Sequence, residues 1–216
     1  YTKVVFPTRE LMRVNEGEHA IFSSNKWHHF AAVCSDGSAR SLYLDGTLIA
    51  IRAVDVPEHV KSVDPFRIGG NITGEGIFPG AIDDVRVFAR ALDQHEILQN
   101  MYSNTCSSCH GMLAEWTFDV WGGGNYLPTG TIPSVIGGEA FDGHAGSDVS
   151  QTKYNKPLAV SPRELLPVLP TAGSAGMAIF FDGGSAIFDH IALPDTALDG
   201  ITFMTWFKNS GPLFDD

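Results

Sequence analysis

The chain has 216 residues and a formal net charge of −11, from 25 acidic and 14 basic residues. It has no cluster of lysines and arginines, which argues against nucleic acid as a partner, because phosphate binding requires such clusters. No apolar run is long enough to span a bilayer, so no membrane span is expected. The chain starts at Tyr1 without an initiator Met or a signal-peptide pattern, and we expect it to be processed or part of a longer protein.

The first fifty residues predict antiparallel strands. Residues 1–14 alternate loosely and predict a hairpin interrupted at Pro7. Strands are then expected at 30–34, 42–44 and 48–54. Asp36-Gly37 and Asp45-Gly46 lie between these apolar runs, and Asp-Gly between alternating runs is a strong hairpin signal. The pattern predicts a meander.

A strand, a glycine-rich loop, a second strand and a helix are expected next. The short strand at 66–68 leads into a loop that runs to Gly80, and apolar residues then alternate over 82–87. The helix is predicted at 92–101, with Asp93 as N-cap and Glu96 three residues later, as in a capping box.

The second half of the chain repeats a β pattern. Residues 113–119 alternate as a strand, and an irregular Gly-, Pro- and Ser-rich region follows. Further strands are expected at 176–181, 186–188 and 201–208.

Several separate segments carry a family resemblance. In order they are WHHFAAV, LYLDG, FRIGG and FPGAIDDVRVFARALDQHEI. Together they resemble the C-terminal half of a laminin-G-like domain of the concanavalin A-like lectin/glucanase superfamily. WTFD, GMAIFFDG and TFMTWFK of the second half resemble the N-terminal half of the same domain. The resemblance implies an all-β, antiparallel jelly-roll sandwich.

The two halves stand in reversed order. Residues 1–105 correspond to a C-terminal half, 106–112 to a cysteine-containing linker, and 113–216 to an N-terminal half. The chain is then either a window from a tandem array or a circular permutant. A half sandwich would expose an apolar face and unpaired strand edges, so each half must complete a sandwich. We favour an array, or a polymer in which neighbouring copies complement one another.

The cysteines allow two interpretations. Cys106, Cys109 and His110 match C-x-x-C-H, the attachment pattern of c-type haem. No helices of the cytochrome kind flank the motif, and the alternative is a disulfide within the linker, to Cys34 or to another chain. A red protein with a Soret band would support haem, and a colourless preparation from a haem-competent host would end that interpretation.

The acidic residues do not indicate an enzyme. Asp83 and Asp84 are adjacent on a strand and are expected on opposite faces, so they cannot act together on one substrate. The E-x-D-x-x-E or E-x-D-x-E motif of the superfamily's retaining glucanases is absent from the sequence. The resemblance implies that calcium could bind, and solvated loop acids are the alternative. The candidate calcium ligands are Asp119, Asp142, Asp148, Asp182 and Asp189.

Three further features bear on function. Asn71 begins an N-glycosylation sequon. Loop aromatics Trp121, Tyr126 and Tyr154 could stack on sugars or simply cover the core. For Trp27-His28-His29 the resemblance implies a buried Trp and one outward-facing His.

These features predict a non-catalytic extracellular structural or adhesive module, a repeat of a long surface protein or filament that partners copies of itself. The alternatives are a carbohydrate-binding module, with or without a requirement for calcium, and a haem c electron carrier.

Overall fold

The computed structural model describes residues 3–5, 11–13, 27–35, 39–53, 66–70, 78, 80–101, 110–118, 131–132, 134–137, 142–145, 179–181, 186–188 and 200–209.

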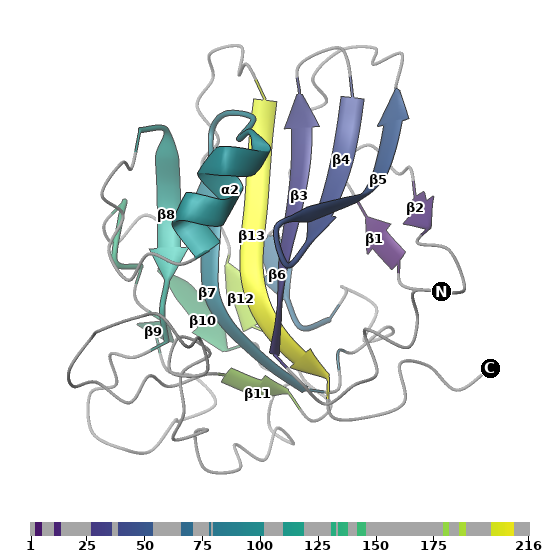
Figure 1. Ribbon diagram of the computed structural model, residues 1–216. Coiled ribbons are helices and arrows are strands. Elements are labelled where there is room, and N and C mark those ends of the chain that lie inside the picture. The colour runs from purple at the N-terminus through teal and green to yellow at the C-terminus, as the bar shows by residue number, and fades with distance from the viewer. Residues whose placement is uncertain are drawn as a thin grey trace, which may run out of the picture.

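A large antiparallel sheet forms the centre of the molecule (Figure 1). Its strands are β3 (Trp27–Ser35), β4 (Ala39–Leu44), β5 (Thr47–Ala53), β7 (Gly80–Phe88), β8 (Met112–Trp116), β11 (Ile179–Phe181) and β13 (Gly200–Asn209). The strand order is β11-β7-β13-β3-β4-β5, and β8 also pairs with β7. Strands β11 and β8 share one edge of β7, because β11 pairs with its first residues and β8 with its last.

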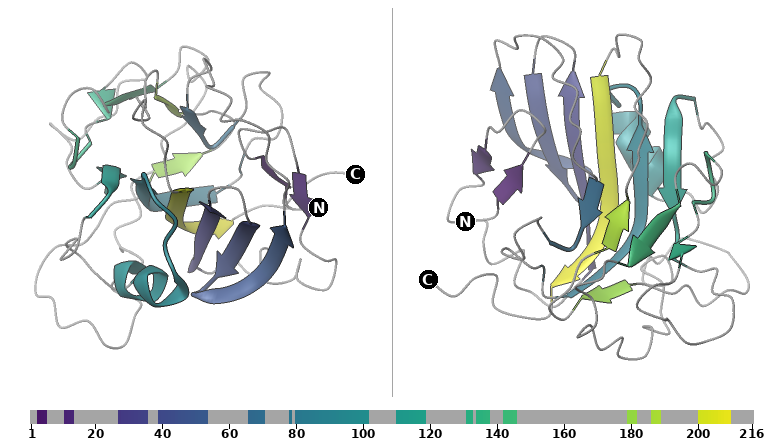
Figure 2. Two further views of the ribbon diagram at one scale, coloured as in Figure 1. Left: turned by 90° about the horizontal axis from the view of Figure 1, so that it is seen from above. Right: turned by 180° about the vertical axis from the view of Figure 1, so that it is seen from behind.

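A smaller sheet faces the large one, and a helix covers the opposite face of the large sheet (Figure 2). The small sheet has the order β6 (Phe66–Ile68), β12 (Ala186–Phe188), β10 (Gly143–Ala145) and β9 (Thr131–Ile132). The helix is α2 (Gln94–Met101), and β1 (Lys3–Val5) pairs with β2 (Leu11–Arg13) as a separate hairpin. The architecture is an all-β sandwich of the concanavalin A-like kind. No helix among the described residues is long and apolar enough to cross a membrane.

Two cores lie on the two faces of the large sheet. Between the sheets, the ring of Phe66 stacks on Trp116 and on Phe203, with ring centroids 6.1 and 5.5 Å apart. Under α2, Ile97 packs against Phe88 and other buried residues of the opposite face. Because successive strand residues point to opposite faces, a strand covered on both sides is buried throughout. Strand β7 is buried at all nine positions.

Several local predictions are confirmed. The loop between β4 and β5 has two residues, Asp45 and Gly46, with φ of 50° and 76°, as a tight hairpin requires. At the start of α2, Asp93 N donates to Glu96 Oε2 at 3.0 Å and Glu96 N donates to Asp93 Oδ1 at 2.8 Å. These two bonds form the expected capping box.

Two expectations need correction. The helix begins at Gln94 rather than at Leu92, which is buried just before it. The Leu92 N–H donates to the hydroxyl of Thr202 on β13 at 3.0 Å, so a tertiary contact replaces the first helical turn. Trp27 is only partly buried, whereas His29 on the same strand is 2% exposed.

The halves of the chain contribute strands to both sheets. Strand β13 lies between β3 and β7, and β8, β11 and β12 also pair with strands of the first half. The first half therefore supplies both neighbours of β13 but not the strand between them.

Candidate functional site

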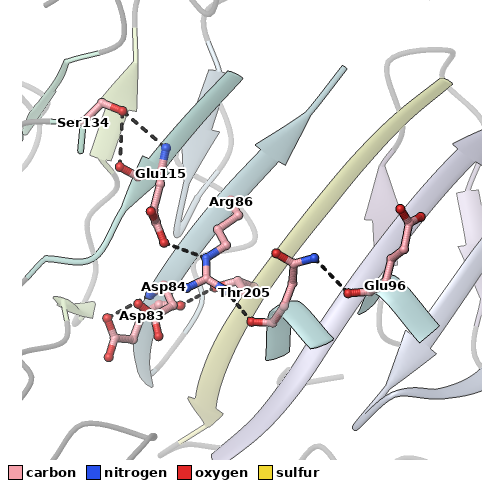
Figure 3. A network of polar contacts seen from close by, with 8 residues as sticks. Asp83, Asp84, Arg86, Glu96, Glu115, Ser134 and Thr205 are labelled. Atoms are coloured by element: carbon pink, nitrogen blue, oxygen red, sulfur yellow. Dashed lines mark hydrogen bonds and ion pairs between the residues drawn. The ribbon is translucent and has the colours of Figure 1, made fainter. Parts of the chain in front are cut away.

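Buried polar and charged side chains form a network around Arg86 on β7 (Figure 3). Arg86 lies directly opposite Glu115 in the β7–β8 ladder, and its Nε donates to Glu115 Oε1 at 2.7 Å. Both side chains are at most 5% exposed. Two buried opposite charges in this geometry stabilise each other, and either one alone would be strongly destabilising.

The network extends from Arg86 to helix α2. A terminal guanidinium nitrogen of Arg86 donates to the carbonyl oxygen of Asn100. The Asn100 side-chain amide then donates to Glu96 O at 2.8 Å. Glu96 also pairs with Arg90, whose Nη1 lies 2.7 Å from Glu96 Oε1. Charged side chains therefore fix the C-terminal end of the helix to the sheet and its first turn to the preceding loop.

On its other side the network reaches the segment beside β8. Glu115 N donates to Ser134 Oγ at 3.3 Å, and Val135 N donates to Glu115 O at 2.7 Å. Ser134 N donates in turn to Asp142 Oδ1 at 2.8 Å. The backbone of Glu115 is thus held by this segment while its carboxylate holds Arg86.

Asp83 and Asp84 lie at a β-bulge, where the β7–β13 register shifts between Met204 and Trp206. Asp84 has a φ of 49°, and its N–H donates to Asp83 Oδ1 at 2.8 Å. Thr205 Oγ1 donates to Asp83 O at 2.9 Å. The bulge interrupts the regular alternation from which the two side chains were expected on opposite faces. The two acids are 1% and 4% exposed, so they lie inside the fold.

His29 is a buried imidazole on β3, on the same face of the large sheet as Arg86. Its ring meets Trp206 edge-on, with centroids 5.3 Å apart and an interplanar angle of 69°. Its Nδ1 has no hydrogen-bond partner among the described residues. Burial lowers the pKa of His29 to about 3, and the positive charge of Arg86 contributes to the shift. The ring is therefore neutral at pH 7.

The β4–β5 turn contacts the segment around His29. Asp45 Oδ1 accepts a hydrogen bond from His29 N, and its Oδ2 lies 2.8 Å from His28 Nδ1. The carbonyl of Gly46 accepts a hydrogen bond from Gln94 Nε2 at 2.8 Å, which ties the turn to α2. Each of these contacts fixes one element against another.

Three of the residues predicted as site residues are described, and they do not come together. His110 is exposed, and its carbonyl accepts a hydrogen bond from Arg90 Nε at 2.8 Å. Cys34 is a partly buried free thiol on β3, and Asp142 holds Ser134 N. Within the described ranges, no three His, Cys, Asp or Glu side chains form a group that could hold a metal ion. The other predicted site residues lie outside the described part of the chain: Asn71, Cys106, Cys109, Asp119, Trp121, Tyr126, Asp148, Tyr154, Asp182 and Asp189.

The sequence carries only a weak signal for the network. Arg86 and Glu115 each interrupt an apolar strand, and a charge in such a strand is usually assigned to a solvent face. Both faces of β7 are covered, so Arg86 requires a partner of opposite charge. Only the pairing register identifies that partner as Glu115.

One comparison with known proteins gives a match. The laminin G model described as the concanavalin A-like lectin/glucanases superfamily matches residues 13–98, which include β3 to β7 and most of α2. No curated protein and no solved structure matches the chain. The family match agrees with the sandwich architecture. Residues 13–98 are therefore similar to the concanavalin A-like lectin/glucanases superfamily, in its laminin G group.

Proposed function

We propose that the protein is a non-catalytic structural or adhesive module of an extracellular or cell-surface protein, in which half-sandwiches complete one another. The observation that carries this proposal is the position of β13. It comes from the second half of the chain and pairs on both sides with strands of the first half. A half of this kind needs a complement, and a repeat in an array can obtain one from its neighbour.

The non-catalytic part of the proposal is supported by the state of the described carboxylates. A glycosidase needs two carboxyl groups that flank a bound sugar. Asp83, Asp84 and Glu115 are each less than 5% exposed and belong to the bulge or to the ion pair with Arg86. These three carboxylates stabilise the fold, and none of the three is exposed to act as acid or base on a bound sugar.

Two measurements on the intact chain test the proposal. Light scattering over a range of concentrations should give masses above the 23.3 kDa of one chain, because halves complement between copies. Incubation with soluble β- and α-glucans should release no reducing ends. A compact monomer at every concentration would argue against the filament form, and release of reducing ends would overturn the non-catalytic assignment.

A carbohydrate-binding module is the second candidate, and the match to a superfamily that contains lectins favours it. Its proposed contacts are the loop aromatics Trp121, Tyr126 and Tyr154, and in its calcium-dependent form loop acids hold the ion. A glycan array probed with and without calcium tests it. Binding that is lost in Trp121→Ala would support this candidate, and silence under both conditions would remove it.

A further inference from the structure

The first half of the chain leaves one strand position in its sheet to be filled. Strands β3 and β7 both lie in the segment that matches the family, yet they do not pair with each other (Figure 1). Strand β13 occupies the position between them, which we call the central position. Its register runs from Gly200 opposite Ser35 to Lys208 opposite Trp27 on the β3 side.

Filling the central position satisfies both sheet edges and both cores. Ladder hydrogen bonds run from β13 to β3 and to β7, and without them two rows of backbone donors and acceptors would be unpaired. Ile201 and Phe207 belong to the core between the sheets, whereas Met204 belongs to the core under α2. Thr202 Oγ1 donates to Arg90 O at 2.8 Å and thereby secures the loop before the helix.

The described part of the second half is bound to the first half along most of its strands. Strands β8 and β11 pair with β7, and β12 pairs with β6. Each of these contacts is reproduced if the second half comes from another molecule with the same sequence. The two arrangements then differ in the connection between halves and in the entropy of association, so protein concentration decides between them.

We infer that the second half, Met112 to Asn209, exchanges between copies, so that the β13 of one copy fills the central position of another. This inference rests on the proposed function and names its partner as a second copy of this chain. The carbonyls of His110 and Gly111 accept hydrogen bonds from Arg90 and Ala89, so the eight residues 102–109 are left to join α2 to the exchanged half. Fully extended, they reach roughly 26–29 Å. That length allows the second half to reach an adjoining molecule. Reciprocal exchange closes a dimer, and head-to-tail exchange builds an open chain.

A native cysteine provides the test. Cys34 lies directly opposite Ile201 in the β3–β13 ladder, and facing residues of antiparallel strands lie within disulfide range. With Cys106 and Cys109 replaced by Ser, two full-length chains are prepared. One retains Cys34, and the other carries Cys34→Ser with Ile201→Cys. They are mixed, unfolded in guanidinium, refolded together at several concentrations and then oxidised.

Exchange predicts a covalent heterodimer of twice the 23.3 kDa chain mass, with a yield that falls on dilution. A single chain that carries both Cys34 and Ile201→Cys should link to itself when dilute, and should form linked dimers or a ladder when concentrated. The inference is overturned if the mixture yields unlinked monomers at every concentration while the double-cysteine chain links only to itself.

A register control separates exchange from random collision. Lys208→Cys replaces Ile201→Cys in the second chain, and Lys208 lies opposite Trp27 at the other end of β3. This chain should not link to Cys34, and equal linkage would overturn the inference. If Ile201→Cys alters the circular dichroism of the reduced chain, the facing pair Ala32→Cys and Phe203→Cys gives the same measurement.

The outcome is separable from that of the proposed function. Release of reducing ends from glucans would overturn the structural role while leaving an exchange dimer intact. Self-linked monomers alone would overturn the exchange and the filament form of the proposed function, while adhesion of a single module to another surface would still stand.

Discussion

Lowering the pH from 7 to 5 should destabilise the fold through His29. Burial beside Trp206, together with the charge of Arg86, lowers the pKa of this imidazole from 6.5 to about 3. Between these two values the unfolded chain binds a proton that the folded chain does not. Stability contributed by the neutral ring is therefore complete above about pH 6.5 and declines as the pH falls toward 3. At pH 5 the loss is about 2 kcal/mol, because each pH unit below 6.5 corresponds to about 1.4 kcal/mol.

Urea unfolding followed by tryptophan fluorescence at pH 7 and pH 5 measures this loss. The wild-type chain should lose about 2 kcal/mol more than His29→Gln or His29→Phe, neither of which can titrate at this position. All other ionisable groups are common to the three chains, so the difference isolates His29. Val33→Ala, on the same face of β3, lowers stability but keeps the imidazole and should retain the wild-type pH dependence. An equal loss in His29→Gln and in wild type would refute the reasoning.

Three further predictions concern the network, the helix cap and the strand packing. Glu115→Ala leaves Arg86 buried without its partner carboxylate and should lower the free energy of unfolding in urea by about 3–5 kcal/mol. Arg86→Met combined with Glu115→Leu should recover most of this loss. A loss below about 1 kcal/mol for the single change would contradict a buried pair. Asp93→Ala removes the N-cap of α2 and should cost about 1 kcal/mol, whereas His95→Ala on the exposed face should change little, and equal costs for both would argue against the cap. Gly80→Ala places a methyl group against a backbone carbonyl of β13 and should cost about 1–3 kcal/mol, measured by thermal unfolding, and an unchanged melting temperature would contradict this packing.

The local elements were predictable because their signals lie within a few residues of one another. Asp45-Gly46 determines a two-residue turn, since both residues adopt positive φ there. Asp93 and Glu96 determine the start of α2 through a reciprocal pair of hydrogen bonds three residues apart. The exact first residue of the helix was missed because Leu92 N–H bonds to Thr202, which lies 110 residues away.

The polar network was not predictable in the same way. Arg86 and Glu115 are 29 residues apart, and their contact depends on the β7–β8 register and on the cover that α2 provides. The bulge at Asp84 also escaped the pattern, because periodicity assumes an uninterrupted strand. A glycine normally occupies such a positive-φ position, and Asp is among the few other residues that tolerate it.

The sequence by itself predicted the all-β architecture, the tight hairpin at Asp45-Gly46 and the capped helix, because short-range patterns encode them. The family resemblance came from several ordered segments, of which the match covers residues 13–98. Only the tertiary structure decided which strands are neighbours. Strand β13 enters between β3 and β7 because its two apolar faces complement both cores and its backbone completes two ladders. Such complementarity joins segments more than 100 residues apart, and no local pattern reports it. Tertiary contacts also bring Arg86 to Glu115 through the β7–β8 register and keep the buried His29 neutral beside Trp206.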